Sequence, residues 1–401
     1  KFMANIISYW MMRFFLFFAE KCTIICMSFV EVLSIFVNSF NDKEFSSITT
    51  KDFSNTLTSK KNCVPQMATS VHNVRPSEIG VVAALGDSFS VGYGVFSSGV
   101  GTFDSHPEVS FSMGGEGDLK KHITIPNILR KLGASLTGYS TKESTGLNLA
   151  FPGAQSSHLH RQAVELVQRF PEEVKSNKWK LLTIFVGLND MAGELFQRVR
   201  FLSPSSRNEI FKRNMRGLDA LRDRYKGNLE DALRVLSSHL NRTIVNIVSV
   251  PNMATFFEAQ ASASRLVPST DVDMRQMCDS LNSAIESIVK EGSFERDDFT
   301  LVQQPLFSSE NEAPKTSTGA VDTALFASDL FHLSQKGQSM YAAALWNNML
   351  EPVGAKSSRY LTYPYRLRSP NEDCPYIRTS KNSDTCDGNR EVHQQEKFIE
   401  I

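Results

Sequence analysis

Four short apolar runs recur along the chain, and each is rich in β-branched residues. They are VVAAL at 81–85, LLTIFV at 181–186, TIVNIVSV at 243–250 and FTLVQ at 299–303. Nearly continuous apolar character over such a length is typical of strands that are covered on both faces, as in a parallel sheet. The pattern therefore predicts four strands of one central sheet.

Apolar residues with helical spacing lie between these runs. One set is Leu159, Ala163, Leu166, Val167 and Phe170, and another is Met274, Met277, Leu281, Ala284, Ile285 and Ile288. Intervals of three and four residues place such side chains on one face of a helix. A last helix is predicted over 335–350, before Pro352 and Gly354. Strands that alternate with helices predict a doubly wound α/β domain.

Residues 1–40 differ from the rest because large apolar side chains crowd together there. A membrane-spanning helix needs about 20 mainly apolar residues, and four charged residues divide this stretch, namely Arg13, Glu20, Lys21 and Glu31. The interpretations are a hydrophobic N-terminal targeting segment, a membrane anchor or an artefact of gene prediction. Residues 41–64 are polar and predict a linker, which leaves 65–401 as a single domain with a C-terminal extension.

Composition excludes some partners. Lys and Arg number 43 and Asp and Glu number 43, so the formal net charge is zero. Nucleic-acid binding requires clustered basic residues, so nucleic acid is not expected as the main partner. With 41% hydrophobic and 21% charged residues, the chain can bury a large core.

The chain has six cysteines, and none shows the spacing of a zinc site. Loss of the N-terminal segment would leave four, which allow two disulfides in three pairings. This number favours an oxidising compartment over buried thiols, so a secreted, extracellular or lumenal location is expected.

A serine follows the first predicted strand, in the sequence Leu85-Gly86-Asp87-Ser88. Open α/β sheets place their ligands at the carboxyl ends of strands, and Gly86 allows the backbone to turn sharply there. Ser88 is therefore a candidate nucleophile. In the alternative interpretation, Asp87 or Ser88 only caps a following helix.

A base for this serine is available near the other end of the chain, where Asp329 precedes His332 by three residues. A serine nucleophile needs a general base that a third group orients. This spacing lets the carboxylate of Asp329 fix the imidazole of His332 within one local turn, and His332 can then accept the proton of Ser88. An isolated pair of this kind is also common in surface turns.

Two further strand ends offer donors for an oxyanion. The strand at 181–186 leads into Gly187-Leu188-Asn189-Asp190, and Gly153 follows a short apolar run. The N–H groups of Ser88 and Gly153 and the side-chain amide of Asn189 are candidate donors. Each of these residues alone would be an ordinary turn residue.

The motifs around Ser88, Gly153, Asn189 and His332 occur together and in order, and here the sequence resembles the SGNH, or GDSL-type, hydrolase family. The resemblance is strongest to the phospholipase B1 type, the membrane-associated phospholipase B/lipase group. It rests on the segments 69–94, 179–190 and 331–354 and extends from about Pro65 to Ser383.

The resemblance implies a three-layer α/β/α, flavodoxin-like fold with a central parallel sheet. It implies hydrolysis of acyl esters of phospholipids and lysophospholipids without a metal or another cofactor, and transient contact with a membrane or micelle surface. Carried over to this chain, the triad is Ser88, Asp329 and His332, and the oxyanion hole is Ser88, Gly153 and Asn189.

Other interpretations remain open. The same scaffold could serve a general carboxylesterase, a carbohydrate deacetylase or a catalytically silent secreted binding protein. From their position after the nucleophile, Phe103 and Phe111 are predicted to flank an acyl pocket. The sequence leaves the oligomeric state open.

Overall fold

The computed structural model describes residues 67–99, 103–200, 207–263, 271–387 and 397–400. The predictions for 1–40 and 41–64 lie outside these residues. The chain divides into two units, Lys1–Met67 and Ala68–Ile401, and every element below belongs to the second unit. No helix among the described residues combines the length and the apolar character needed to cross a membrane.

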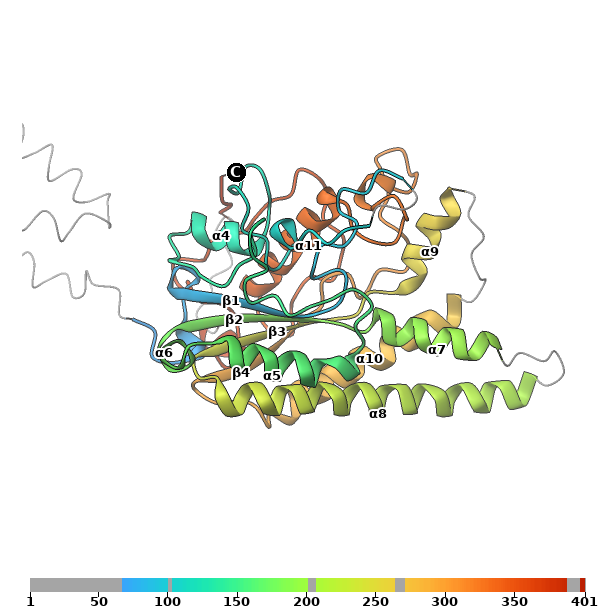
Figure 1. Cartoon of the computed structure of the whole chain (residues 1–401), viewed down its shortest axis with the longest axis horizontal. Coiled ribbons are helices and arrows are strands. Elements are labelled where there is room, and N and C mark those ends of the chain that lie inside the picture. The colour runs from blue at the N-terminus through green and yellow to red at the C-terminus, as the bar shows by residue number, and fades with distance from the viewer. Residues whose placement is uncertain (1–66, 100–102, 201–206, 264–270, 388–396, 401) are drawn as a thin grey trace, which may run out of the picture. The chain divides into compact units, whose positions relative to one another are not determined.

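A four-stranded parallel sheet forms the centre of this unit (Figure 1). Its strands are β1 (Ile79–Gly86), β2 (Trp179–Phe185), β3 (Thr243–Val248) and β4 (Phe299–Gln304), and they pair in the order β1-β2-β3-β4. All four predicted strands are confirmed, with ends that shift by at most two residues. Their burial on both faces accounts for the continuous apolar runs.

An irregular segment covers the other edge of β1. Val82 donates its N–H to the carbonyl of Thr137 at 3.0 Å, and Ala84 donates to the carbonyl of Leu147 at 3.1 Å. These bonds continue the ladder outside any regular strand. Strand β1 therefore has hydrogen-bonded neighbours on both sides, which fixes the strand end that precedes Ser88.

Helices cover both faces of the sheet, and their bounds follow here: α4 (Ile125–Lys131), α5 (Leu159–Arg169), α6 (Glu172–Asn177), α7 (Leu188–Arg200), α8 (Arg207–His239), α9 (Met253–Ser262), α10 (Asp271–Glu291), α11 (Gln335–Leu350) and α12 (Ser380–Asp387). Helices α5, α8 and α10 lie on one face, and α4 and α11 lie on the other (Figure 1). The three-layer α/β/α fold is confirmed, and α11 has the predicted bounds.

One disulfide joins Cys374 to Cys386 in the C-terminal extension. Cys278 is a buried thiol on α10 whose Sγ donates to the carbonyl of Val250 at 3.0 Å. Cys63 lies outside the described residues. Of the predicted bridges, the described residues thus contain one.

Candidate active site

Two contacts fix the end of β1 in front of Ser88. Gly86 has φ of 151°, and a Cβ at this position would lie 2.2 Å from the carbonyl oxygen of Phe185, so only glycine fits. The side chain of Gln162 on α5 accepts from the N–H of Gly86 at 2.8 Å and donates to its carbonyl at 2.9 Å. Helix α5 therefore holds the backbone from which the serine projects.

A tight turn, with no helix, follows over residues 87–93. Asp87 accepts a hydrogen bond from the N–H of Phe89 at 3.0 Å, and the carbonyl of Ser88 accepts from the N–H of Tyr93 at 3.0 Å. The helix-capping interpretation is therefore wrong. Asp87 is fully buried, and this burial, with a smaller contribution from the charge of Asp190, raises the pKa of its carboxyl group to about 7.

The structure brings the predicted serine, histidine and aspartate together. Nε2 of His332 lies 3.0 Å from Oγ of Ser88, and Nδ1 of His332 lies 2.6 Å from Oδ2 of Asp329. The other carboxylate oxygen of Asp329 accepts from the N–H groups of Phe331 and His332, each at 2.9 Å. Burial alone would raise the pKa of Asp329, but the hydrogen bond and charge of His332 and these backbone donors outweigh it and lower the pKa.

The segment that carries this pair is a compact turn before α11. Ala327 donates to the carbonyl of His332 at 2.7 Å, and Leu330 between the two side chains has φ of 58°, in the left-handed region. A non-glycine residue in this region costs free energy, and such conformations often occur at functional sites. Ser334 then caps the helix by accepting from the N–H of Gly337 at 3.2 Å.

The two predicted oxyanion segments are tied to each other. The side chain of Asn189, in the first turn of α7, donates to the carbonyl of Ala154 at 3.0 Å, and Gln155 donates to the carbonyl of Asn189 at 3.1 Å. A primary amide has two donors, and among the described residues the second one has no partner. Gly153 has φ of 79° and is exposed at the surface.

A second connection joins the same segments through residues that the sequence analysis missed. Ser156 donates its N–H to Asp190 at 2.9 Å and its hydroxyl to the same carboxylate at 2.5 Å, while Asn228 on α8 donates to Oγ of Ser156 at 2.9 Å. Burial raises the pKa of Asp190 although the hydrogen bonds from Ser156 oppose this shift. The network thus fixes the segment after Gly153 against α7 and α8.

Aromatic side chains surround His332, but only one of the two predicted phenylalanines is near it. Tyr93 contacts the imidazole edge-on, with 5.0 Å between ring centroids, and Phe103 stacks on Tyr93 at 5.8 Å. Phe111 is completely buried and packs against Phe185 and Tyr341 in the core. The prediction that Phe111 flanks an acyl pocket is therefore wrong, because the residue has no surface for a ligand.

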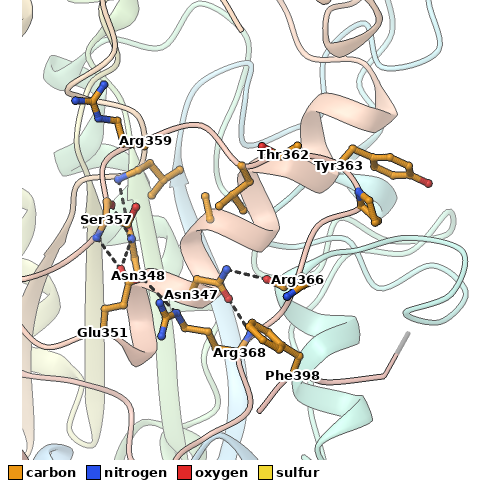
Figure 2. A pocket seen from close by; sticks show the side chains of 14 residues that line it. Asn347, Asn348, Glu351, Ser357, Arg359, Thr362, Tyr363, Arg366, Arg368 and Phe398 are labelled. Carbon is orange, nitrogen blue, oxygen red and sulfur yellow. Dashed lines mark hydrogen bonds and ion pairs between the residues drawn. The ribbon is translucent and has the colours of Figure 1, made fainter. Parts of the chain in front are cut away.

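A cavity of about 480 Å³ lies along α11 and contains none of the candidate residues (Figure 2). Asn347 donates to the carbonyl of Arg366 at 2.9 Å and accepts from the N–H of Arg368 at 2.9 Å. Glu351 pairs with the guanidinium of Arg368 at 3.3 Å. These groups attach the C-terminal extension to α11, so we interpret the cavity as a gap between packed segments.

Metal ligands are not gathered anywhere within the part of the chain that the structure describes: no group of three or more His, Cys, Asp or Glu side chains there is placed to hold an ion. His158 and His160 lie close in the sequence, but they belong to no such group. Nδ1 of His158 accepts from the N–H of Gln155 at 3.0 Å, which is a local turn contact.

Two curated proteins are similar to most of this chain. Membrane-associated phospholipase B1 of Homo sapiens is 33% identical over 363 residues, which cover 83% of this chain and 23% of that protein. The protein of the same name from Mus musculus is 32% identical over 380 residues, which cover 86% of this chain and 24% of its own length. The chain thus spans about a quarter of the length of these relatives.

The solved structures that match the chain are more distant in sequence. An extracellular lipase from Streptomyces rimosus is 14% identical with a TM-score of 0.33, and the match covers 65% of this chain and 95% of that one. Phospholipase A1 from Streptomyces albidoflavus NA297 is 16% identical with a TM-score of 0.32 and the same coverage.

The sequence profile of one family matches residues 82–345, which is well over half of the chain and includes all the candidate residues. The matched region begins within β1 and ends within α11, so it contains the sheet as well as the segments that carry Ser88, Asn189 and His332. The chain therefore belongs to the GDSL-like lipase/acylhydrolase family.

Proposed function

We propose that this protein is a serine hydrolase that cleaves acyl esters of phospholipids and lysophospholipids through an acyl-enzyme intermediate. The observation that carries the proposal is the chain of contacts from Ser88 through His332 to Asp329, with heavy-atom distances of 3.0 and 2.6 Å. Both distances are within hydrogen-bond reach, as a nucleophile, its base and the group that orients the base require.

Asp329 fixes the tautomer of the histidine. As a carboxylate it accepts the proton on Nδ1, so Nε2 of neutral His332 is left as the acceptor for the hydroxyl proton of Ser88. The lowered pKa of Asp329 keeps this carboxylate ionised. Oγ of Ser88 then attacks the ester carbonyl carbon as its proton moves to Nε2, and the resulting imidazolium is stabilised by Asp329.

The tetrahedral intermediate places its negative charge on the former carbonyl oxygen. We assign the N–H groups of Ser88 and Gly153 and the free amide N–H of Asn189 as the donors to this oxygen. Collapse of the intermediate breaks the bond to the alcohol, which leaves with the proton from His332. Water then attacks the acyl-enzyme with His332 as base, and the fatty acid and Ser88 are released.

Two observations support the substrate class and the location. Relatives that are 32–33% identical are named phospholipase B1, and Tyr93 and Phe103 provide an apolar surface beside His332 for an acyl chain. The Cys374–Cys386 disulfide favours a secreted, extracellular or lumenal location. Contact with a membrane or micelle surface would then be transient.

Labelling with a serine-directed fluorophosphonate tests the proposal. Wild type should label and Ser88→Ala should not, while Ser90→Ala serves as a control for a nearby serine that has no histidine contact. Labelling of Ser88→Ala at the wild-type rate would place the nucleophile elsewhere. No labelling of folded wild type would favour a silent binding protein.

Product analysis then separates the substrate classes. Wild type should release fatty acid from phosphatidylcholine and from lysophosphatidylcholine, and Ser88→Ala should release none. Turnover of a short soluble ester without either lipid would indicate a general carboxylesterase, and acetate release from an acetylated oligosaccharide would indicate a deacetylase.

A further inference from the structure

Two phenylalanines next to the catalytic segments have exposed rings. Phe96 is 50% exposed and Phe151 is 39% exposed, whereas the other aromatic residues near Ser88, among them Phe89 and Tyr93, are buried or half-buried. A single exposed apolar residue is unremarkable on a soluble protein. These two, however, lie on segments that adjoin the candidate catalytic residues.

Phe96 lies beside the segment that carries Asp329. Its neighbour Ser97 accepts hydrogen bonds from the N–H of Ser328 at 3.1 Å and from the hydroxyl of Ser328 at 2.9 Å. Ser328 directly precedes Asp329. The loop that carries Phe96 is therefore attached to the acid–base turn.

Phe151 lies beside the other side of the site. Its N–H is bonded to the carbonyl of Gly86 at 3.3 Å, two residues before Ser88, and Gly153 follows two residues later in the sequence. One exposed ring thus adjoins the acid–base turn, and the other adjoins the candidate oxyanion segment.

A histidine supports each ring from behind. Phe96 packs edge-on against His106 with centroids 4.8 Å apart, and Phe151 packs in the same way against His158 at 5.2 Å. Each ring therefore has one face or edge fixed against the protein while a large part remains in water. Such fixed exposed rings lose little conformational entropy when a partner covers them.

We propose that Phe96 and Phe151 dock the catalytic edge onto a lipid surface, a bilayer or micelle, by placing their rings among the acyl chains. The inference rests on the proposed function, because whatever carries the scissile ester must approach the edge where Ser88 lies. Rings that flank this edge would enter the apolar region of an aggregate while the ester reaches the serine. Burial of the exposed ring surfaces would stabilise the bound state.

Vesicle binding in a Ser88→Ala background tests docking without hydrolysis. We expect Phe96→Ser and Phe151→Ser each to weaken binding to phosphatidylcholine vesicles by about tenfold, as loss of the burial of part of a phenyl ring implies. The matched control is Phe398→Ser. Phe398 is also partly exposed, at 37%. It pairs with Arg368, whose N–H donates to Asn347 near the C-terminal end of α11. His332 lies just before the N-terminal end of the same helix.

A spectroscopic variant keeps the test independent of any loss of folding. Phe96→Trp and Phe151→Trp in the Ser88→Ala background should show a blue shift of tryptophan emission when vesicles are added, because indole would move from water into lipid. Phe398→Trp should show no shift beyond that of the parent protein, whose own tryptophans include Trp10 in the N-terminal segment. Equal shifts at all three positions, or no shift at Phe96 and Phe151, would overturn the proposal.

Activity measurements distinguish docking from substrate-pocket contacts. With Ser88 restored, the ratio of phosphatidylcholine-vesicle hydrolysis to short-soluble-ester hydrolysis should fall about tenfold in Phe96→Ser and Phe151→Ser and stay constant in Phe398→Ser. An unchanged ratio with both activities reduced would show that the rings act on the bound ester and would overturn docking. If wild type hydrolysed neither substrate, the proposed function would fail while the vesicle-binding result would still be interpretable.

Discussion

Packing as well as hydrogen bonding fixes the imidazole of His332. Tyr93, Phe331 and Phe89 have their ring centroids 5.0, 5.2 and 5.7 Å from the imidazole. Asp329 holds one ring nitrogen and Ser88 contacts the other. A base that is held on several sides needs little reorganisation when it accepts a proton, which favours the catalytic role proposed for it.

Phe103 and Phe111 should respond differently to truncation. We expect Phe103→Ala to alter the relative rates for esters of different acyl length, since Phe103 stacks on Tyr93 beside His332. Phe111→Ala should instead lower the unfolding free energy by about 3–5 kcal/mol, because it removes a fully buried ring from the core. Rates across a series of p-nitrophenyl esters and denaturant unfolding check these outcomes.

Each variant acts as the control for the other. Unchanged chain-length preference in Phe103→Ala would remove this residue from the acyl pocket. A Phe111→Ala protein of wild-type stability would contradict its place between Phe185 and Tyr341.

At the residue scale, the contacts among Ser88, His332 and Asp329 could be predicted because these residues lie in short motifs after strands or in one turn. Phe111 was wrongly predicted because its burial depends on residues far away in the chain, Phe185 and Tyr341. Gln162 does leave a signal in the sequence, because it is a polar residue three positions after Leu159, within the apolar stripe of α5, and it is 3% exposed. A buried amide at such a position usually has a specific hydrogen-bonding role.

At the scale of elements, Ser156 connects three parts of the fold. It bonds to Asp190 in the first turn of α7 and accepts from Asn228 on α8, and its own segment continues back to Gly153. Loss of the hydroxyl would leave the half-buried side chains of Asp190 and Asn228 with one partner fewer each. The candidate oxyanion donors would then be held less firmly against each other.

We therefore expect Ser156→Ala to lower kcat on a soluble ester by about tenfold with a much smaller change in KM, since a displaced oxyanion donor weakens mainly transition-state binding. Ser156→Thr, which keeps the hydroxyl, should recover most of the rate. The control is Ser283→Ala on the exposed side of α10, which should behave as wild type. A loss in Ser156→Ala that appears only in KM would contradict a role in holding these donors.

The regular elements could be predicted because burial leaves a pattern in the sequence: a continuous apolar run in β2, which is buried on both faces, and apolar residues at intervals of three and four in α10. The irregular segment that pairs with β1 could not be predicted. Its pairing residues, Thr137 and Leu147, belong to a stretch interrupted by Gly138 and Gly146, both with positive φ. Such a stretch lacks the alternation of residues that indicates a strand. Its pairing depends on the neighbouring edge of β1, which the local sequence does not reveal.

At the scale of the whole molecule, the central sheet buries a lysine, a residue type that usually lies on the surface. Lys180 on β2 is 2% exposed, and its ammonium donates to the carbonyls of Lys178 at 2.7 Å and Asn241 at 2.8 Å. Burial, with a smaller contribution from the charge of Arg242, lowers the pKa of Lys180 to about 7. Lys356, near the end of α11, has a pKa of about 7 for the same main reason.

These lysines should make the unfolding free energy rise with pH above neutrality. Between pH 7 and pH 10.5 the unfolded chain binds protons at these groups that the folded chain does not, so stability increases with pH. Lys180→Met should remove a rise on the order of 4 kcal/mol across this range and leave the contribution of Lys356. Denaturant unfolding at pH 7, 8.5 and 10 measures the slope.

The exposed residue Lys290 on α10 offers a matched control, since Lys290→Met removes the same type of charge at the surface. A slope that is equally steep in wild type and Lys180→Met would show that Lys180 is not a source of the pH dependence.

Asp329 and His332 are only three residues apart, and this short separation affects how the protein tolerates changes elsewhere in its sequence. Because their hydrogen bond forms inside one turn, an insertion or a shift elsewhere moves the pair together and alters a single relation, the one between His332 and Ser88, which are 244 positions apart. Loops and helices elsewhere can therefore vary while the acid–base pair depends on only one long-range distance, beside the separate requirement that the candidate oxyanion donors Gly153 and Asn189 stay close to Ser88.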